Sequence, residues 1–208
     1  MRAALIGLAL FSALGGMAAA PAFAAPTAVA LPSGKYVVDP SHASLSWSVV
    51  HFGLSNYTAR FVKFDATVDL DAADVSKSTL KVKVDPTSVR TDYPYPEKVN
   101  FDAEIATSPK FLDGTAHPNV TFVSTGIVVT GAKTAHITGN LTLRGVTKPV
   151  TLSATFVGSG DNPLSKKYTV GFNATTSLKR SDYGVKTYVP MVGDETTLRI
   201  SAAFEKAN

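Results

Sequence analysis

The sequence predicts an all-β protein, an eight-stranded antiparallel barrel with one or two short helices in the 93–117 crossover. Three observations carry this prediction. Nearly every segment after residue 43 alternates apolar and polar residues with a period of two, which is typical of half-buried strands. Two further alternating runs stand back to back around one glycine at 139–156. A single long stretch, 93–117, departs from the alternation.

Six segments contribute one predicted strand each. In the first, Leu45, Trp47, Val49 and His51 share one face, while serines occupy the other. Four of the remaining five repeat this alternation, whereas 119–129 is more apolar and alternates less regularly. Together with the two runs in 139–156 they make about eight strands, and the six segments are 44–52, 64–70, 78–86, 119–129, 168–175 and 197–205.

The two runs in GNLTLRGVTKPVTLSATF, residues 139–156, predict a hairpin. The apolar residues are odd-numbered before the turn and even-numbered after it. Pairing Leu143 with Val150 also pairs Leu141 with Leu152 and places both pairs on one face. We therefore expect a short loop around 145–148.

The crossover at 93–117 begins with two prolines, and its middle has helical character. Ser108 followed by Pro109 has the order of an N-cap and a first helical residue. We expect this segment to form a flap over one end of the barrel.

The first 24 residues predict a cleavable signal peptide. One arginine precedes an apolar run, and Ala22-Phe23-Ala24 has the small-x-small pattern of a cleavage site. A membrane anchor is disfavoured by the Gly15-Gly16 pair and by Pro21. We expect cleavage after Ala24, with Ala30 as the alternative. The predicted organisation is a signal peptide at 1–24, a flexible segment at 25–34 and one domain at 35–208, in a periplasmic or secreted protein.

The composition gives no sign of a cofactor, metal or nucleic-acid partner. The chain has no cysteine, four scattered histidines and a formal net charge of +4, with lysines spread along polar strand faces. The acidic segment DLDAAD, 69–74, resembles part of a calcium loop but lacks its glycine and its terminal glutamate. We interpret it as a loop between strands.

The inward face of the barrel supplies the candidate ligand-binding residues. His51 either bonds to a backbone carbonyl in the core or contacts the polar head of an apolar ligand. The aromatic residues either fill the barrel or surround one small ligand, because an eight-stranded barrel permits both. The candidates are Trp47, His51, Phe52, Phe61, Phe64, Phe101, Ile105, Phe111, Phe122 and Phe172.

Several segments resemble the YceI-like polyisoprenoid-binding proteins. They are YVVDPSHASLSWSVVHFGLSNYTARF, FLDGTAHPNVTFVST, ITGNLTLRGVTKPVTLSATFVGSG, SDYGV and VGDETTLRISAAFE, in this order. The resemblance implies an exported, lipocalin-like barrel without catalytic activity. Its cavity would hold an isoprenoid-type or other long-chain lipid, such as a polyprenyl chain or a quinone-like molecule, for storage, transport or stress protection.

His51 matches a histidine at a strand end in the family, but two positions depart from the family pattern. Ala59 stands where a glycine is usual before the aromatic Phe61. The crossover has Asp102-Ala103-Glu104-Ile105 where the family often has Asp-x-His-Leu, so Glu104 replaces a histidine.

Two other functions stay open at this point. A hydrolase acting on envelope lipids or sugars would use Asp102, Glu104 and His51 as acid–base groups, although the two carboxylates diverge if their segment is helical. A barrel with a solid core would be a structural or stress-response module without a ligand. A homodimer is also open.

Overall fold

The structure is a computed structural model that describes residues 31–207. The predicted signal peptide at 1–24 and both cleavage positions lie outside these residues. Within the described part, none of the helices has the length and apolar character needed to cross a membrane.

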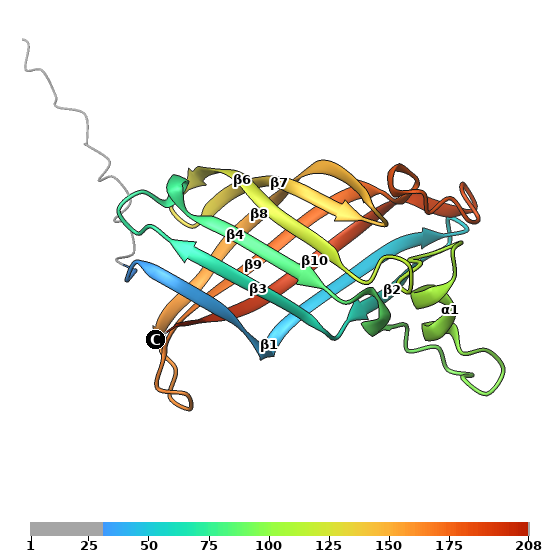
Figure 1. Cartoon of the computed structure of the whole chain (residues 1–208), viewed down its shortest axis with the longest axis horizontal. Helices are drawn as coiled ribbons and strands as arrows, with labels where there is room; N and C mark the ends of the chain where they lie inside the picture. Colours follow the sequence, from blue (N-terminus) through green and yellow to red (C-terminus); the bar gives the residue numbers. More distant parts are fainter. Residues whose placement is uncertain (1–30, 208) are drawn as a thin grey trace, which may run out of the picture.

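The chain forms an antiparallel barrel (Figure 1). Ten strands belong to one sheet, which closes because β1 pairs with β10 as well as with β3. The predicted eight-stranded barrel is confirmed by the closed circle of β1, β3, β4 and β6–β10. The strands are β1 Gly34–His51, β2 Ser55–Phe61, β3 Phe64–Leu70, β4 Thr79–Val84, β5 Val89–Arg90, β6 Val120–Gly131, β7 Thr134–Leu143, β8 Val146–Asp161, β9 Tyr168–Lys179 and β10 Val192–Lys206.

Strand β1 bends near its middle and therefore pairs with two different strands, β3 and β2, along the same edge. Its register with β10 shifts between Val38 and Ala43, where Pro40 has no amide hydrogen to donate. Before the bend, Gly34 to Val37 pair with β3, and after it Leu45 to His51 pair with β2. Strand β2 and its short partner β5 therefore extend the wall at one end of the barrel.

The hairpin of β7 and β8 forms, but its predicted register is wrong. Leu143 pairs with Val146, and Leu141 pairs with Lys148. The connection is a two-residue turn in which Arg144 and Gly145 have φ angles of 51° and 74°, as a type I′ turn requires. Leu143 was predicted to pair with Val150, so the observed register differs from the predicted one by four residues. Because this shift is even, the apolar side chains of both strands still share one face.

The 93–117 crossover contains one α-helix, α1 Phe101–Thr107, at the right-hand end of the barrel in Figure 1. The Asn100 side chain accepts a hydrogen bond from the Ala103 amide and caps the helix. The second helix suggested by Ser108-Pro109 does not form, because Ser108 is the C-cap of α1 and a turn follows it. Residues 31–207 also contain three 3-10 helices, and they are η1 Val75–Lys77, η2 Pro86–Ser88 and η3 Arg180–Tyr183.

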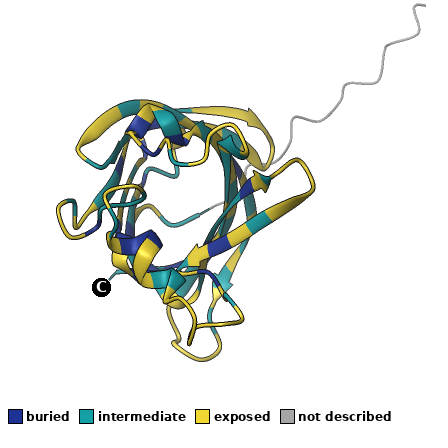
Figure 2. Cartoon of the chain, turned by 90° about the vertical axis from the view of Figure 1, so that its right-hand side faces the viewer, coloured by how far each residue is buried: buried dark blue, intermediate teal, exposed yellow. Residues whose placement is uncertain are grey.

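Two clusters of buried hydrophobic residues occur in the described part of the chain, one in the barrel wall and one beneath α1. The first surrounds Tyr36, Val170 and Phe204 on β1, β9 and β10. The second joins Ile105 of α1 to Ala59 and contains partly buried aromatic side chains at its edge. A view along the barrel shows the strands as a ring around a central space (Figure 2).

Candidate functional site: an apolar cavity in the barrel

A cavity of about 580 Å³ lies inside the barrel. All eight strands of the closed circle contribute to its lining. The lining residues are Leu31, Leu45, Phe64, Ala66, Val68, Leu70, Ala72, Val75, Ser78, Thr79, Leu80, Val82, Ile127, Val129, Gly131, Ala132, Lys133, Thr134, Ala135, Ile137, Leu152, Ala154, Phe156, Phe172, Ala174, Ile200, Ala202 and Phe204.

The cavity exists because many inward positions carry small side chains. Alternation directs every second residue inward, and several of these residues are alanines, including Ala66, Ala154 and Ala174. The volume lies within the range of small-molecule pockets. A barrel filled by its own side chains is therefore not what the structure shows.

Three stacked phenylalanines form one side of the cavity. Phe172 makes edge contacts with Phe156 and Phe204, at ring-centroid distances of 5.8 and 6.2 Å. Edge-to-face contact is a preferred arrangement of aromatic pairs. The cavity thus has an aromatic wall across β8, β9 and β10.

Polar lining residues lie at one end of the cavity. They are Ser78 and Thr79 beside η1, and Lys133 and Thr134 at the turn between β6 and β7. Val75 and Val129 belong to the same end and are 37% and 55% exposed. The cavity therefore reaches the surface at this end, opposite α1 in Figure 1.

The predicted ligand-binding residues divide between the cavity and other locations. Phe64 and Phe172 line the cavity. The cluster beneath α1 holds five more, namely Trp47, Phe61, Phe101, Ile105 and Phe111. Ligand contact by residues outside the cavity lining stays a prediction.

The other three candidates also lie outside the cavity lining. Phe52 follows β1 in an exposed turn. Phe122 is buried, and its ring lies where a side chain at Gly139 would project. The His51 ring stacks edge-on against Phe52, with 4.3 Å between ring centroids. Within residues 31–207 we find no hydrogen bond from its imidazole to a backbone carbonyl.

The carboxylates proposed for a hydrolase diverge on α1. Asp102 Oδ1 accepts hydrogen bonds from the Thr91 amide and hydroxyl at 2.7 and 2.6 Å. Glu104, two residues later on the helix, is exposed. Asp102 thus anchors α1 to the segment after β5, and the two acids do not form a catalytic pair.

The acidic segment 69–74 consists of the last two residues of β3 and the structured loop that follows it. Asp71 Oδ1 accepts from the amides of Ala73 and Asp74, and Asp74 Oδ1 accepts from the Ser76 amide to cap η1. In the part of the chain that the structure describes, no three His, Cys, Asp or Glu side chains gather as metal ligands.

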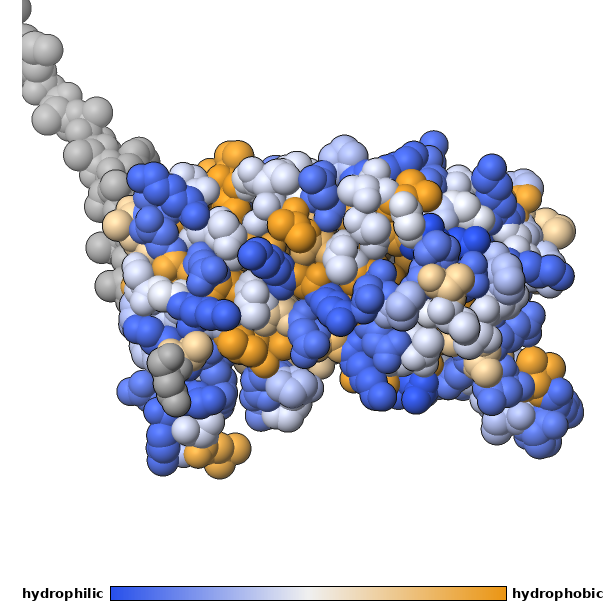
Figure 3. All heavy atoms as spheres, in the orientation of Figure 1, coloured by the Kyte–Doolittle hydropathy of each residue, from blue (hydrophilic) through white to orange (hydrophobic). Residues whose placement is uncertain are grey.

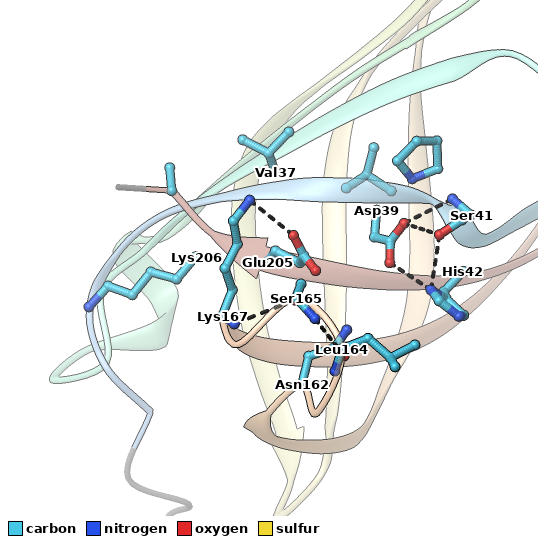
Figure 4. Close-up of a pocket in the computed structure, with 13 residues that line it drawn as sticks. Val37, Asp39, Ser41, His42, Asn162, Leu164, Ser165, Lys167, Glu205 and Lys206 are labelled. Atoms are coloured by element: carbon cyan, nitrogen blue, oxygen red, sulfur yellow. Dashed lines mark hydrogen bonds and ion pairs between the residues drawn. The ribbon is translucent and has the colours of Figure 1, made fainter.

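A second, open pocket of about 600 Å³ lies outside the cavity, between the bend of β1 and the 162–167 loop (Figure 4). Here Asp39 accepts hydrogen bonds from the Ser41 hydroxyl at 2.6 Å and from His42 Nδ1 at 2.6 Å. These bonds lower the pKa of Asp39 to about 2. Ser41 and Asp39 contact the same ring nitrogen, whereas a catalytic triad uses both nitrogens of the histidine.

The sequence interpretation missed most of the lining, because it selected aromatic residues. The alternation of a strand shows which of its residues face inward. Inward small and aliphatic residues such as Ala66, Ala154 and Ile200 were therefore the signal that could have identified the lining.

Comparison with known proteins agrees with the architecture. The YceI-like domain is matched over residues 36–204. A UPF0312 protein of Pseudomonas putida is 39% identical over 156 residues, covering 74% of this chain and 78% of the relative. A UPF0312 protein of Pseudomonas savastanoi is 37% identical over 175 residues, covering 83% and 86%.

Two solved structures share the fold. BcnA of Burkholderia cenocepacia has a TM-score of 0.70 at 23% identity, covering 80% of this chain and 98% of that one. A polyisoprenoid binding domain from Saccharophagus degradans has a TM-score of 0.60 at 11% identity, covering 85% and 100%.

Proposed function

The chain belongs to the YceI-like family, and from this premise we propose that it is a binding protein, not an enzyme, for an isoprenoid-type or other long apolar chain. Its role would be storage or transport of that lipid, or stress protection, in the periplasm. The lipid-binding part is supported by the family and by the name of the structurally similar domain from Saccharophagus degradans. Export is supported by the sequence pattern of residues 1–24.

The observation that carries the proposal is the apolar cavity. An extended hydrocarbon chain that fills it gains about 25 cal/mol for each Å² of apolar surface removed from water. Such a ligand needs few directed contacts, which matches a lining of aliphatic and phenyl side chains. The side of the molecule seen in Figure 3 carries many hydrophilic residues with hydrophobic ones scattered among them, and the lipid would be carried inside the barrel, away from water.

Lipid extraction tests the proposal directly. We expect native mass spectrometry and solvent extraction of the purified protein to find a long-chain lipid, and added phytol to raise the melting temperature. Ligand at about a hundred times its dissociation constant should add about 2.7 kcal/mol to stability. Absence of both lipid and thermal shift would refute the proposal.

A matched pair of variants separates cavity binding from surface adsorption. Ala174→Phe places a ring in the cavity and should abolish the shift, whereas Thr175→Phe, on the exposed face of the same strand, should preserve it. Equal shifts in both variants would place the lipid outside the barrel.

A further inference from the structure

We propose that Lys133 is the head-group contact of the cavity, and that the ligand is a single-chain lipid with an anionic oxygen head, a carboxylate or a phosphate. This inference rests on the proposed function and adds to it the chemistry and the orientation of the ligand. The head would lie at the open end of the cavity, and the tail would point toward α1.

Lys133 is the one charged residue among those that line the cavity. The rest of the lining is apolar except for the hydroxyl groups of Ser78, Thr79 and Thr134. A lysine ammonium offers three hydrogen-bond donors and one positive charge. An otherwise apolar chamber with one cation at its rim is complementary to a lipid with one anionic group.

The backbone of Lys133 is held in place over the cavity. Lys133 occupies the turn between β6 and β7, and Gly131 pairs with Thr134 at the base of that turn. The Lys133 carbonyl accepts a hydrogen bond from the Phe156 amide at 2.7 Å. Phe156 is itself part of the aromatic wall, so the turn and the wall keep a fixed relationship.

The charge of Lys133 has no carboxylate partner among residues 31–207. None of the seven ion pairs in this part of the chain includes it. Lys77, on η1 at the same end, differs because its ammonium lies 3.4 Å from Asp74 Oδ2. Lys133 is therefore the charged residue of the cavity lining, and its ammonium has no carboxylate partner in this part of the chain.

Desolvation favours the same orientation. An ionised head that stays at the exposed rim keeps much of its hydration, whereas burying it in the chamber would be very costly. Toward α1, the polar atoms Trp47 Nε1, Tyr57 Oη and Thr196 Oγ1 are buried without hydrogen-bond partners in the described part of the chain, and their residues lie outside the cavity lining. The arrangement thus directs an apolar tail inward and a charged head to Lys133.

Four compounds with one branched skeleton test the inference: phytane, phytol, phytanic acid and phytyl phosphate. Their dissociation constants would be measured calorimetrically on the delipidated full chain, below each critical micelle concentration. We expect phytanic acid or phytyl phosphate to bind about three- to tenfold more tightly than phytol, with the preference reduced by salt. Which of the two anions is preferred identifies the head as carboxylate or phosphate.

Substitutions at Lys133 complete the test. Lys133→Met should remove the preference for anions while phytol binding changes by less than about twofold, and Lys133→Arg should retain the preference. Lys77→Met is the matched control and should leave the preference for anions over phytol unchanged.

Three results would overturn the inference about Lys133: no preference for anions in the unaltered protein, a preference that survives Lys133→Met, or equal losses for phytol and the anions. Failure of all four compounds to bind would instead refute lipid binding itself.

Discussion

Arg180 Nε donates a hydrogen bond to the carbonyl oxygen of Gly193 at 2.8 Å, which joins the first residue of η3 to the start of β10. The same guanidinium donates to the carbonyls of Val185, Thr187 and Val192. Burial lowers the pKa of Arg180, and the Asp194 carboxylate opposes that change. One buried cation therefore organises the loop between β9 and β10.

Arg180→Met should destabilise the protein by about 3–5 kcal/mol, because it strands several carbonyl groups that the guanidinium satisfies. Urea unfolding measures the loss. Lys179→Met, at the exposed neighbouring position, is the control and should change stability by about 0.5 kcal/mol or less. Similar effects of the two substitutions would mean that the loop does not depend on Arg180.

Gly139→Ala should destabilise by about 1–3 kcal/mol through overpacking. A Cβ atom there would clash with Phe122 Cζ and would lie 2.6 Å from the Val123 carbonyl oxygen. Gly158→Ala in β8, where a Cβ meets nothing within 4 Å, is the matched control. In a double-mutant cycle, Phe122→Leu should recover part of the loss at Gly139. If the stability changes of Gly139→Ala and Phe122→Leu simply added, contact with the Phe122 ring would be excluded as the cause of the destabilisation.

Thr196→Val should raise the melting temperature of the ligand-free protein. Thr196 Oγ1 is buried without a hydrogen-bond partner in the described part of the chain, and such a group costs about 1–3 kcal/mol. Thr58→Val, on an exposed position of β2, should have little effect. A lower melting temperature for Thr196→Val would show that the hydroxyl has a partner in solution.

Asp39 should titrate at an unusually low pH. The hydrogen bond from the Ser41 hydroxyl, followed by that from His42, lowers its pKa from 3.8 to about 2. Since the folded-state value is depressed, the stabilisation is fully present above the ordinary value and is lost as pH falls through about 2. NMR titration of the carboxyl carbon measures this pKa, and Ser41→Ala should raise it. An unchanged value in that variant would assign the shift to another group.

The strands with clean alternation were predictable, as β3 shows by occupying the expected segment 64–70. Strand β2 was missed because only Tyr57, Ala59 and Phe61 point to the apolar side, and Ala59 gives a weak signal. The hairpin register depended on Arg144 adopting a positive φ, which is uncommon for a residue other than glycine.

The cavity itself could not be predicted from residue types. Aromatic residues mark apolar regions, but half of the selected phenylalanine and tryptophan residues, such as Trp47 and Phe101, contribute to the packing beneath α1. Space arises where small residues from distant strands face one another, as Ala66 of β3 and Ala174 of β9 do across the barrel interior. Whether such residues face one another depends on how the barrel closes and on the register between its strands.

The seam between β1 and β10 joins opposite ends of the chain, since Tyr36 pairs with Lys206. A ring closed in this way is incomplete until its final strand arrives, and contacts so distant in sequence form slowly. Until then, β1 and β9 each present an unsatisfied edge to which another copy can add. A polypeptide that stops before residue 192 lacks β10 and cannot close the barrel. We therefore expect it to aggregate through its open strand edges and not to form a smaller barrel.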